Sequence, residues 1–214
     1  IQSAVTQLRQ ARDLTVQSGS GALNAAGREA IATQVESIRD GLMSIANSSY
    51  QGRNVFAASS GASVAFAAGP AYTWTGTPGD SLDRRISPDT IVRADSDGST
   101  VFGNGSSSVF ALLDSIAADV RAGVDTGSRL AEIDTKMNAM LGELSGVGAR
   151  TNRLTDTQGI ISQKLQDLQV GISGFEDVDL TATIVDLQAQ EVAYKGALGA
   201  TARVLQPTLM DYLR

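Results

Sequence analysis

The clearest pattern of apolar positions lies between Ser128 and Gly174. In alternating steps of three and four, the series is Leu130, Ile133, Met137, Met140, Leu144, Val147, Thr151, Leu154, Gln158, Ile161, Leu165, Leu168, Ile172 and Phe175. Only Thr151 and Gln158 in this series are polar. Such a repeat, held over six heptads without a proline, predicts one helix with a coiled-coil seam, on the order of 70 Å long.

Glycines punctuate this predicted helix at positions 142, 146, 148 and 159. Each glycine lowers helix propensity by roughly 1 kcal/mol. A glycine also has no side chain to keep a neighbouring backbone away. We therefore interpret these four positions as places where another backbone approaches closely.

Two earlier segments have the same helical spacing. One helix is predicted over residues 1–18, and a second from its predicted N-cap, Asn24, to about Ser48. The sequence SGSG at 18–21 separates them. These two helices can supply the partner surfaces that the long seam requires.

A further helix is predicted from Asp179, which can cap it, to the end of the chain. Its apolar stripe contains Leu180, Ile184, Leu187, Tyr194, Leu198, Leu205, Leu209 and Tyr212 or Leu213. Glu191 and Thr201 interrupt the stripe, and Pro207 should kink the helix or change its direction. The stripe needs a partner surface, for which we expect another subunit or an N-terminal helix. Because residue 1 is not methionine, we expect that helix to lie upstream of this sequence.

The middle of the chain, residues 51–108, is instead rich in glycine, serine, threonine, aspartate and proline. Short β-like pieces are predicted at residues 54–57, 71–75, 85–86, 90–94 and 100–102. Asp97-Gly98 lies between two of these pieces and predicts a hairpin turn. A helix over 107–122 follows. The predicted fold is therefore mainly α, an elongated coiled-coil-like helical rod with a small β-rich module inserted between helices.

The composition excludes several kinds of catalytic and metal site. Among 214 residues, 42% are hydrophobic but only 5% are aromatic, so the core should be aliphatic. The chain has no cysteine and no histidine, which excludes disulfides, thiolate or imidazole metal ligands and a Ser-His-Asp triad. The formal charge of −6 disfavours electrostatic binding to the phosphates of nucleic acid. No apolar run approaches the ~20 residues of a membrane span.

Candidate acidic sites have simpler explanations. Residues 95–98, DSDG, resemble the start of a calcium loop but lack the later ligands and the bidentate glutamate. Glu176, Asp177 and Asp179 are acidic residues at a helix start, where capping and the helix dipole account for them. We therefore expect no catalytic, metal or cofactor site. A hydrolase using Ser, Asp or Lys is the rival interpretation, and no motif supports it.

Several motifs resemble the bacterial flagellin family. Residues 47–56, NSSYQGRNVF, resemble its N-x-x-Y-x-G-R-x-x-F junction between a helix and the outer module. Residues 147–154, VGARTNRL, are similar to its G-A-x-x-N-R-L signature, and 12–17, RDLTVQ, to R-E-L-T-V-Q. Residues 177–180, DVDL, resemble the start of its C-terminal helix. The likeness covers the whole chain apart from about 50 residues expected at the front.

Within the family, the ending at 202–214 and the small β insertion resemble the hook-associated protein 3 group of the hook–filament junction. This resemblance implies a secreted, non-enzymatic subunit, exported by the flagellar type III apparatus with a chaperone on its C-terminal helix. It implies a ring of copies of this chain between hook-associated protein 1 and flagellin. A filament flagellin and a flagellin-like cell-surface binding module remain as alternatives.

Together these observations predict a rod of residues 1–50 and 107–175, an outer module of 51–106 and an assembly helix of 176–214. The predicted site residues fall into three sets. Rod packing is assigned to Leu130, Ile133, Leu144, Asn152, Arg153, Leu154, Ile161, Leu165 and Leu168. The helix-to-module junction is assigned to Asn47, Gly52, Arg53 and Phe56. The assembly interface is assigned to Leu180, Ile184, Leu187, Tyr194, Leu198, Leu205, Leu209 and Leu213.

Overall fold

The computed structural model describes residues 1–19, 23–57, 59–69, 71–176 and 179–204. The chain forms two units, residues 1–158 and residues 159–214. None of the helices in the described part is both long enough and apolar enough to cross a membrane.

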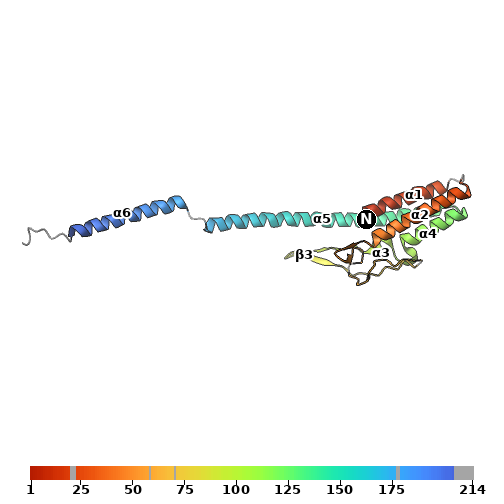
Figure 1. Ribbon diagram of the computed structural model, residues 1–214, viewed down its shortest axis with the longest axis horizontal. Helices are drawn as coiled ribbons and strands as arrows, with labels where there is room; N and C mark the ends of the chain where they lie inside the picture. The colour runs from red at the N-terminus through yellow and green to blue at the C-terminus, as the bar shows by residue number, and fades with distance from the viewer. Residues whose placement is uncertain (20–22, 58, 70, 177–178, 205–214) are drawn as a thin grey trace, which may run out of the picture. The chain divides into compact units, whose positions relative to one another are not determined.

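The first unit is built on helices that lie side by side (Figure 1). They are α1 (Gln2–Ser18), α2 (Ala25–Ala46), α4 (Val109–Ala122) and the first part of α5 (Gly127–Glu176). The predicted N-cap of α2 is confirmed, because Asn24 Oδ1 accepts a hydrogen bond from Gly27 N at 2.8 Å. Ser108 Oγ caps α4 in the same way through Ala111 N, and Gly123 ends α4 in the left-handed region.

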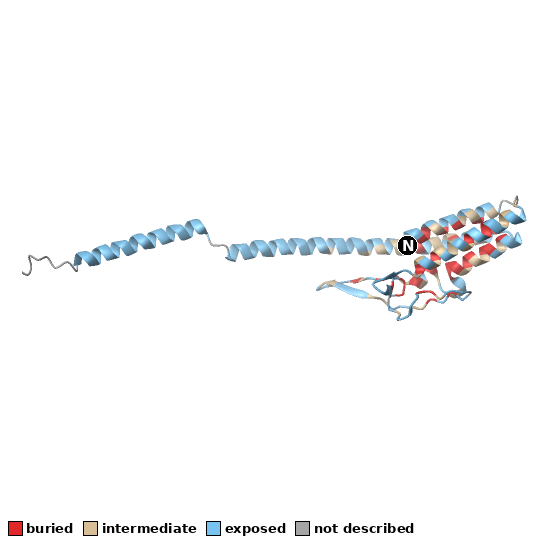
Figure 2. Ribbon diagram, in the orientation of Figure 1, coloured by how far each residue is buried: buried red, intermediate tan, exposed pale blue. Residues whose placement is uncertain are grey.

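Apolar side chains from these helices form one core, and Figure 2 colours the buried residues of the helices red. Its fully covered members include Leu8, Val35, Leu42, Leu113, Ile116, Ile133 and Met140. The spacing of Ala4, Leu8 and Ala11 in α1, and of Ile31, Val35 and Leu42 in α2, turns one stripe of each helix inward. The predicted helical rod is therefore present, with α4 as a full member of the bundle.

The β-rich part contains two short antiparallel hairpins. Strands β1 (Ser49–Tyr50) and β2 (Arg53–Asn54) form one, and β3 (Asp83–Ser87) and β4 (Thr90–Arg93) form the other. The second pairs Asp83 with Arg93 and Arg85 with Ile91. Its turn lies at Pro88-Asp89.

Aromatic side chains join this part to the helical bundle. Phe102 packs edge-on against Phe56, with ring centroids 5.0 Å apart, and stacks on Phe110 of α4 at 5.7 Å. Phe66 contacts both Phe102 and Phe110. The core is therefore continuous from the helices into the β-rich part, although few residues of the chain are aromatic. The division into rod and outer module stays a prediction.

Two local predictions in the β-rich part are wrong. Residues 100–102 are not a strand but lie in the short helix α3 (Gly98–Phe102), which precedes the 3₁₀ turn η1 (Gly105–Ser107). Asp97-Gly98 is not a hairpin turn, because Asp97 Oδ1 caps α3 by accepting from Ser99 N at 2.8 Å. Aspartate favours both turns and caps, and here the tertiary contacts of Gly98 select the cap.

The predicted strands at 54–57 and 71–75 are also largely absent. Within the first, only Asn54 belongs to a strand, and within the second, Trp74 pairs with Phe66 in an isolated bridge. These stretches instead bury Phe56 and Trp74.

The long helix predicted over 128–174 is confirmed as α5, which has 50 residues and no break. Helix α6 (Leu180–Val204) follows it. Asp179 caps α6 as predicted, since its Oδ1 accepts from Thr181 N at 2.9 Å and from Ala182 N at 3.1 Å. The predicted continuation to residue 214, including Pro207, lies outside the described residues.

Candidate assembly surfaces

Helix α6 is coloured as exposed in Figure 2, and the apolar stripe that the sequence predicts on it is exposed as well. Leu180, Ile184, Leu187, Tyr194 and Leu198 are between 52% and 71% exposed. Every described residue of α6 is exposed. Leu205, Leu209 and Leu213, the other predicted members of this interface, lie outside the described residues. Among the described residues nothing covers the stripe, so it is available to another surface.

Two further apolar residues on α6 were not predicted as part of this surface: Val185 and Val192, which are 59% and 70% exposed. They lie seven residues apart, each directly after a position of the stripe. Their seven-residue spacing predicts that both valines lie beside the stripe on one face of the helix, where they widen the apolar surface.

The seam of α5 becomes more exposed to solvent toward its C-terminal end. Ile133 is fully buried in the core of the first unit, and Leu130 and Leu144 are half-buried. Leu154, Ile161, Leu165 and Leu168 are 43–62% exposed, and Asn152 and Arg153 are exposed as well. Of the predicted rod-packing residues, Ile133 therefore lies in the core, whereas those from Asn152 onward lie on the surface.

The glycines of α5 also face open space. A Cβ atom built on Gly142, Gly146, Gly148 or Gly159 would meet no described atom of this chain within 4 Å. The backbone approach that we predicted for these four positions therefore does not occur within the described chain. It remains a prediction for a neighbouring subunit.

Polar contacts tie the first part of α5 to other elements of the first unit. Arg12 Nε of α1 donates to Asp134 Oδ1 at 2.8 Å, and this hydrogen bond lowers the pKa of Asp134. Arg150 Nη2 contacts Glu143 at 2.6 Å, and its Nη1 donates to the Asp95 carbonyl oxygen at 3.3 Å. The second contact ties α5 to the β-rich part just before the exposed portion of the seam begins.

The predicted helix-to-module junction is built around Asn47. Its side chain donates from Nδ2 to the Phe66 carbonyl oxygen at 3.1 Å and accepts from Phe66 N at 2.7 Å. Phe56 is buried, and its carbonyl oxygen accepts from Trp74 Nε1 at 2.8 Å. The end of α2 and the aromatic core of the β-rich part are therefore joined directly.

The other two predicted junction residues lie in or beside a tight turn. Gly52 has φ +75° and follows Gln51 at φ 50°, so the two residues between β1 and β2 both adopt the left-handed conformation of a type I′ hairpin. Arg53 pairs with Tyr50 in that hairpin and is exposed.

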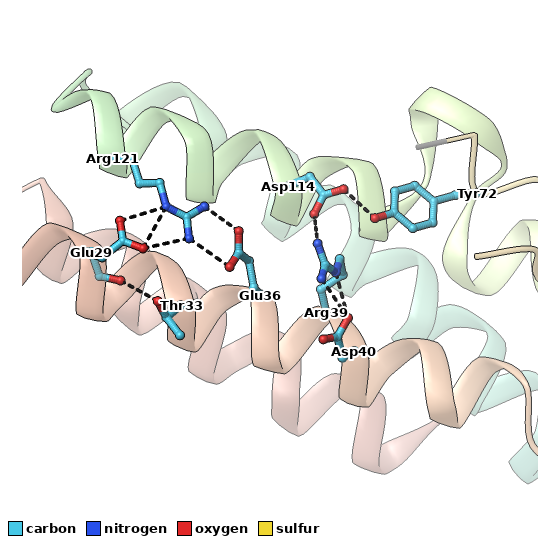
Figure 3. A network of polar contacts seen from close by, with 8 residues as sticks. All are labelled: Glu29, Thr33, Glu36, Arg39, Asp40, Tyr72, Asp114 and Arg121. Atoms are coloured by element: carbon cyan, nitrogen blue, oxygen red, sulfur yellow. Dashed lines mark hydrogen bonds and ion pairs between the residues drawn. The ribbon is translucent and has the colours of Figure 1, made fainter. Parts of the chain in front are cut away.

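A polar network connects α2, α4 and the β-rich part (Figure 3). Arg121 of α4 binds both Glu29 and Glu36 of α2, and its hydrogen bonds lower the pKa of each glutamate. Asp114 accepts from Arg39 and from the Tyr72 hydroxyl. Burial, and then the hydrogen bond to Asp114, raise the pKa of Tyr72 to about 12.

Three of the acidic residues considered as metal or catalytic candidates, Asp95, Asp97 and Asp179, have structural partners, and Asp177 lies outside the described residues. Asp95 binds Arg93 Nε at 2.8 Å and accepts from Leu82 N, while Asp97 and Asp179 cap helices. Although burial opposes the change, the bonds from Arg93 and Leu82 lower the pKa of Asp95. Within the part of the chain that the structure describes, no three acidic residues are grouped so that they could hold a metal ion.

No protein-family model and no curated protein matches this sequence. Solved structures do match its fold. FlgL from Xanthomonas campestris gives a TM-score of 0.71 at 16% identity, with 80% of this chain and 90% of that chain covered. Flagellar hook-associated protein 3 from Legionella pneumophila gives 0.67 at 13% identity, covering 83% and 90%. The flagellar junction protein FlgL from the same bacterium gives 0.61 at 14% identity, covering 77% and 86%.

These identities are low, but the alignments include most of each chain. The shared fold agrees with the order of helices and β-rich part that the sequence motifs predict. The chain therefore has the fold of flagellar hook-associated protein 3, a mainly helical rod with a small β-rich insertion.

Proposed function

We propose that this protein is a non-enzymatic structural subunit of the bacterial flagellum, placed at the junction between hook and filament. The observation that carries the proposal is the fold shared with structures described as FlgL and as a flagellar junction protein. The junction motif at 47–56 and the G-A-x-x-N-R-L-like segment at 147–154 support it independently.

The exposed faces fit a protein that completes its packing on assembly. Helix α6 and the distal part of α5 present leucine, isoleucine, valine and aromatic side chains to solvent. Burying such surface contributes roughly 25 cal/mol per Å², so a matching neighbour would be strongly favoured. Subunits of a tube meet through different patches, head to tail, and each exposed stripe then faces a neighbour.

The proposed partners follow from this location. Other copies of the chain form a ring, with hook-associated protein 1 on the hook side and flagellin on the filament side. An export chaperone covers the C-terminal helix before secretion, and the protein acts outside the cell. Absence of cysteine suits a chain that is exported unfolded and folds in an oxidising environment.

Immunoelectron microscopy of flagella from the source bacterium tests the proposal. Gold-labelled antibody against residues 1–158 should mark a single band at the distal end of the hook. Deleting the gene should leave hooks that lack filaments, and the cloned gene should restore them.

Other labelling patterns would identify the alternatives. Label along the whole filament would assign the chain to filament flagellin and contradict the junction role. A cell-surface binding module would lose its ligand when residues 51–106 are exchanged for those of a relative, whereas a junction protein would keep its place in the flagellum.

A further inference from the structure

The β3–β4 hairpin belongs to the first unit but does not share its apolar core. Within its two strands only Val92 is buried, and Val92 lies outside the core. Neither strand makes an extended contact with any described helix. The hairpin projects from the rest of the β-rich part (Figure 1). Packing against the core therefore does not fix the direction in which the hairpin points.

A cleft lies between the hairpin and α5. Its volume is about 520 Å³, and its walls include Ile86 and Val92 of the hairpin and Val147 and Leu154 of α5. An apolar side chain beside such a space has no atoms to contact on one side and loses their dispersion attraction. The facing side chains of the hairpin and α5 therefore do not hold the hairpin in place either.

Asp95 closes the base of the hairpin. Its Oδ1 accepts from Arg93 Nε at 2.8 Å and from Leu82 N at 3.1 Å. Leu82 directly precedes β3 and Arg93 ends β4, so one carboxylate binds both strand ends. The Asp95 side chain is only 5% exposed, which leaves little water to compete for these bonds. Whatever holds Asp95 therefore also holds the hairpin.

Arg150 connects this base to α5. Its Nη1 donates to the Asp95 carbonyl oxygen at 3.3 Å, and its Nη2 donates to Ser96 Oγ at 3.4 Å and to Glu143 Oε1 at 2.6 Å. The side chains of Arg150 and Glu143 are 23% and 21% exposed. A guanidinium suits this position because its donors form a fixed planar fork that can bind several acceptors at once.

We propose that Arg150 is a clamp that sets the direction of the β3–β4 hairpin relative to α5. While Arg150 binds Asp95 and Ser96, the hairpin is held in one direction across the cleft. Without these bonds it rotates about residues 94–96, because Gly98 N, bonded to the Phe56 carbonyl oxygen, fixes the chain just beyond them. The clamp does not rest on the proposed function, since all of its contacts lie within one chain.

Nitroxide labels can report the direction of the hairpin, because the chain has no cysteine of its own. Asp89→Cys places one label in the hairpin turn, and Asn138→Cys places the other at an exposed position of α5. The distance distribution between them should be single and narrow in otherwise wild-type protein. With Arg150→Gln it should become at least twofold wider, since the hairpin is then free to take several directions. Arg153→Gln, an exposed arginine of the same helix, is the matched control and should leave the distribution unchanged.

Val92→Ala tests the opposite explanation, in which packing of the hairpin decides its direction. Under the proposal this variant widens the distribution less than Arg150→Gln does, because Val92 faces the cleft rather than the core. The reverse order would overturn the proposal. So would an Arg150→Gln distribution as narrow as that of the wild type.

Hydrogen exchange shows whether the effect of Arg150→Gln is local. Backbone amides of α2 and α4 should exchange at wild-type rates, because neither helix contributes to the clamp. Faster exchange throughout both helices would mean that Arg150 supports the whole core, and would contradict a clamp. Glu143→Gln gives an independent test, since it keeps Arg150 but removes the charge that orients it. This variant should also widen the label distribution, and a wild-type distribution would count against the proposal.

Discussion

Asn47 and Phe66 are joined by two reciprocal hydrogen bonds, from Asn47 Nδ2 to the Phe66 carbonyl oxygen at 3.1 Å and from Phe66 N to Asn47 Oδ1 at 2.7 Å. The amide side chain thus pairs with the backbone of a fully buried residue as a strand would. Asn47 also ends α2, so one side chain links the helical bundle to the β-rich part.

Replacing Asn47 with Ala should destabilise the protein by about 2–4 kcal/mol, because both bonds are lost and the buried Phe66 N–H is left without a partner. The free energy of unfolding in urea measures this effect. Asn138→Ala, at an exposed position of α5, is the matched control and should change stability by less than about 0.5 kcal/mol. Equal losses in the two variants would contradict the junction role of Asn47.

Gly146→Ala should stabilise the isolated chain by up to roughly 1 kcal/mol, because alanine has the higher helix propensity and its Cβ meets open space. Gly41→Ala should stabilise the chain less, because the new Cβ would lie 2.9 Å from the Gln7 amide and force that side chain to move. Urea titrations compare the two variants.

The same Gly146→Ala substitution should lower incorporation into flagella, if a neighbouring backbone uses the open space beside this helix. Quantitative immunoblotting of purified flagella measures incorporation. A stabilised variant that assembles at the wild-type level would show that the glycine serves no neighbour.

Tyr72 should make the stability of the protein depend on alkaline pH. Its pKa is raised from an ordinary value near 10 to about 12, so the folded state holds the hydroxyl proton more tightly than the unfolded state does. This contribution is complete below about pH 10 and is lost as the pH rises from about 10 to 12.

Tyr72→Phe removes the hydrogen bond to Asp114 and should cost about 1.5–3 kcal/mol at neutral pH, the usual range for a bond to a charged group. The difference in unfolding free energy between wild type and Tyr72→Phe should shrink between pH 9 and pH 11.5. A difference that stays constant over this interval would show that Tyr72 titrates normally in the folded protein.

Sequence pattern predicted the helices well because their signals repeat. Seam positions from Leu130 to Phe175 recur over six heptads, and Asn24 and Asp179 each cap a helix with their side chains. The sequence did not predict how far along α5 the seam is buried. This depends on which other helices lie beside each turn of α5, a tertiary property that periodicity within α5 does not contain.

The β-rich part was predicted poorly because long-range contacts decide its local structure. Gly98 N donates to the Phe56 carbonyl oxygen, and a Cβ on Gly98 would lie 2.6 Å from that oxygen and 2.8 Å from Trp74 Nε1. A backbone packed this closely must be glycine, and it begins a helix rather than a turn. Local turn preferences predicted a hairpin turn at Asp97-Gly98, whereas the turn lies at Pro88-Asp89. Such preferences contain no information on where Phe56 and Trp74 lie, and these residues decide the conformation at Gly98.

Apolar substitutions on α6 separate assembly from folding. Leu187→Ser with Tyr194→Ser should leave the unfolding free energy within about 0.5 kcal/mol of wild type, because both side chains are already exposed. Incorporation into flagella should nevertheless fall at least tenfold. Gln188→Ser with Lys195→Ser, one position further along the same helix, is the control and should assemble normally.

Deleting residues 176–214 tests most directly the claim that one part of the chain folds by itself and the other serves assembly. In the truncated protein, the thermal melting and helicity of the remaining body should be almost unchanged, and incorporation into flagella should be abolished. Unfolding of the body on this deletion, seen by circular dichroism, or normal incorporation of the truncated chain would contradict the account.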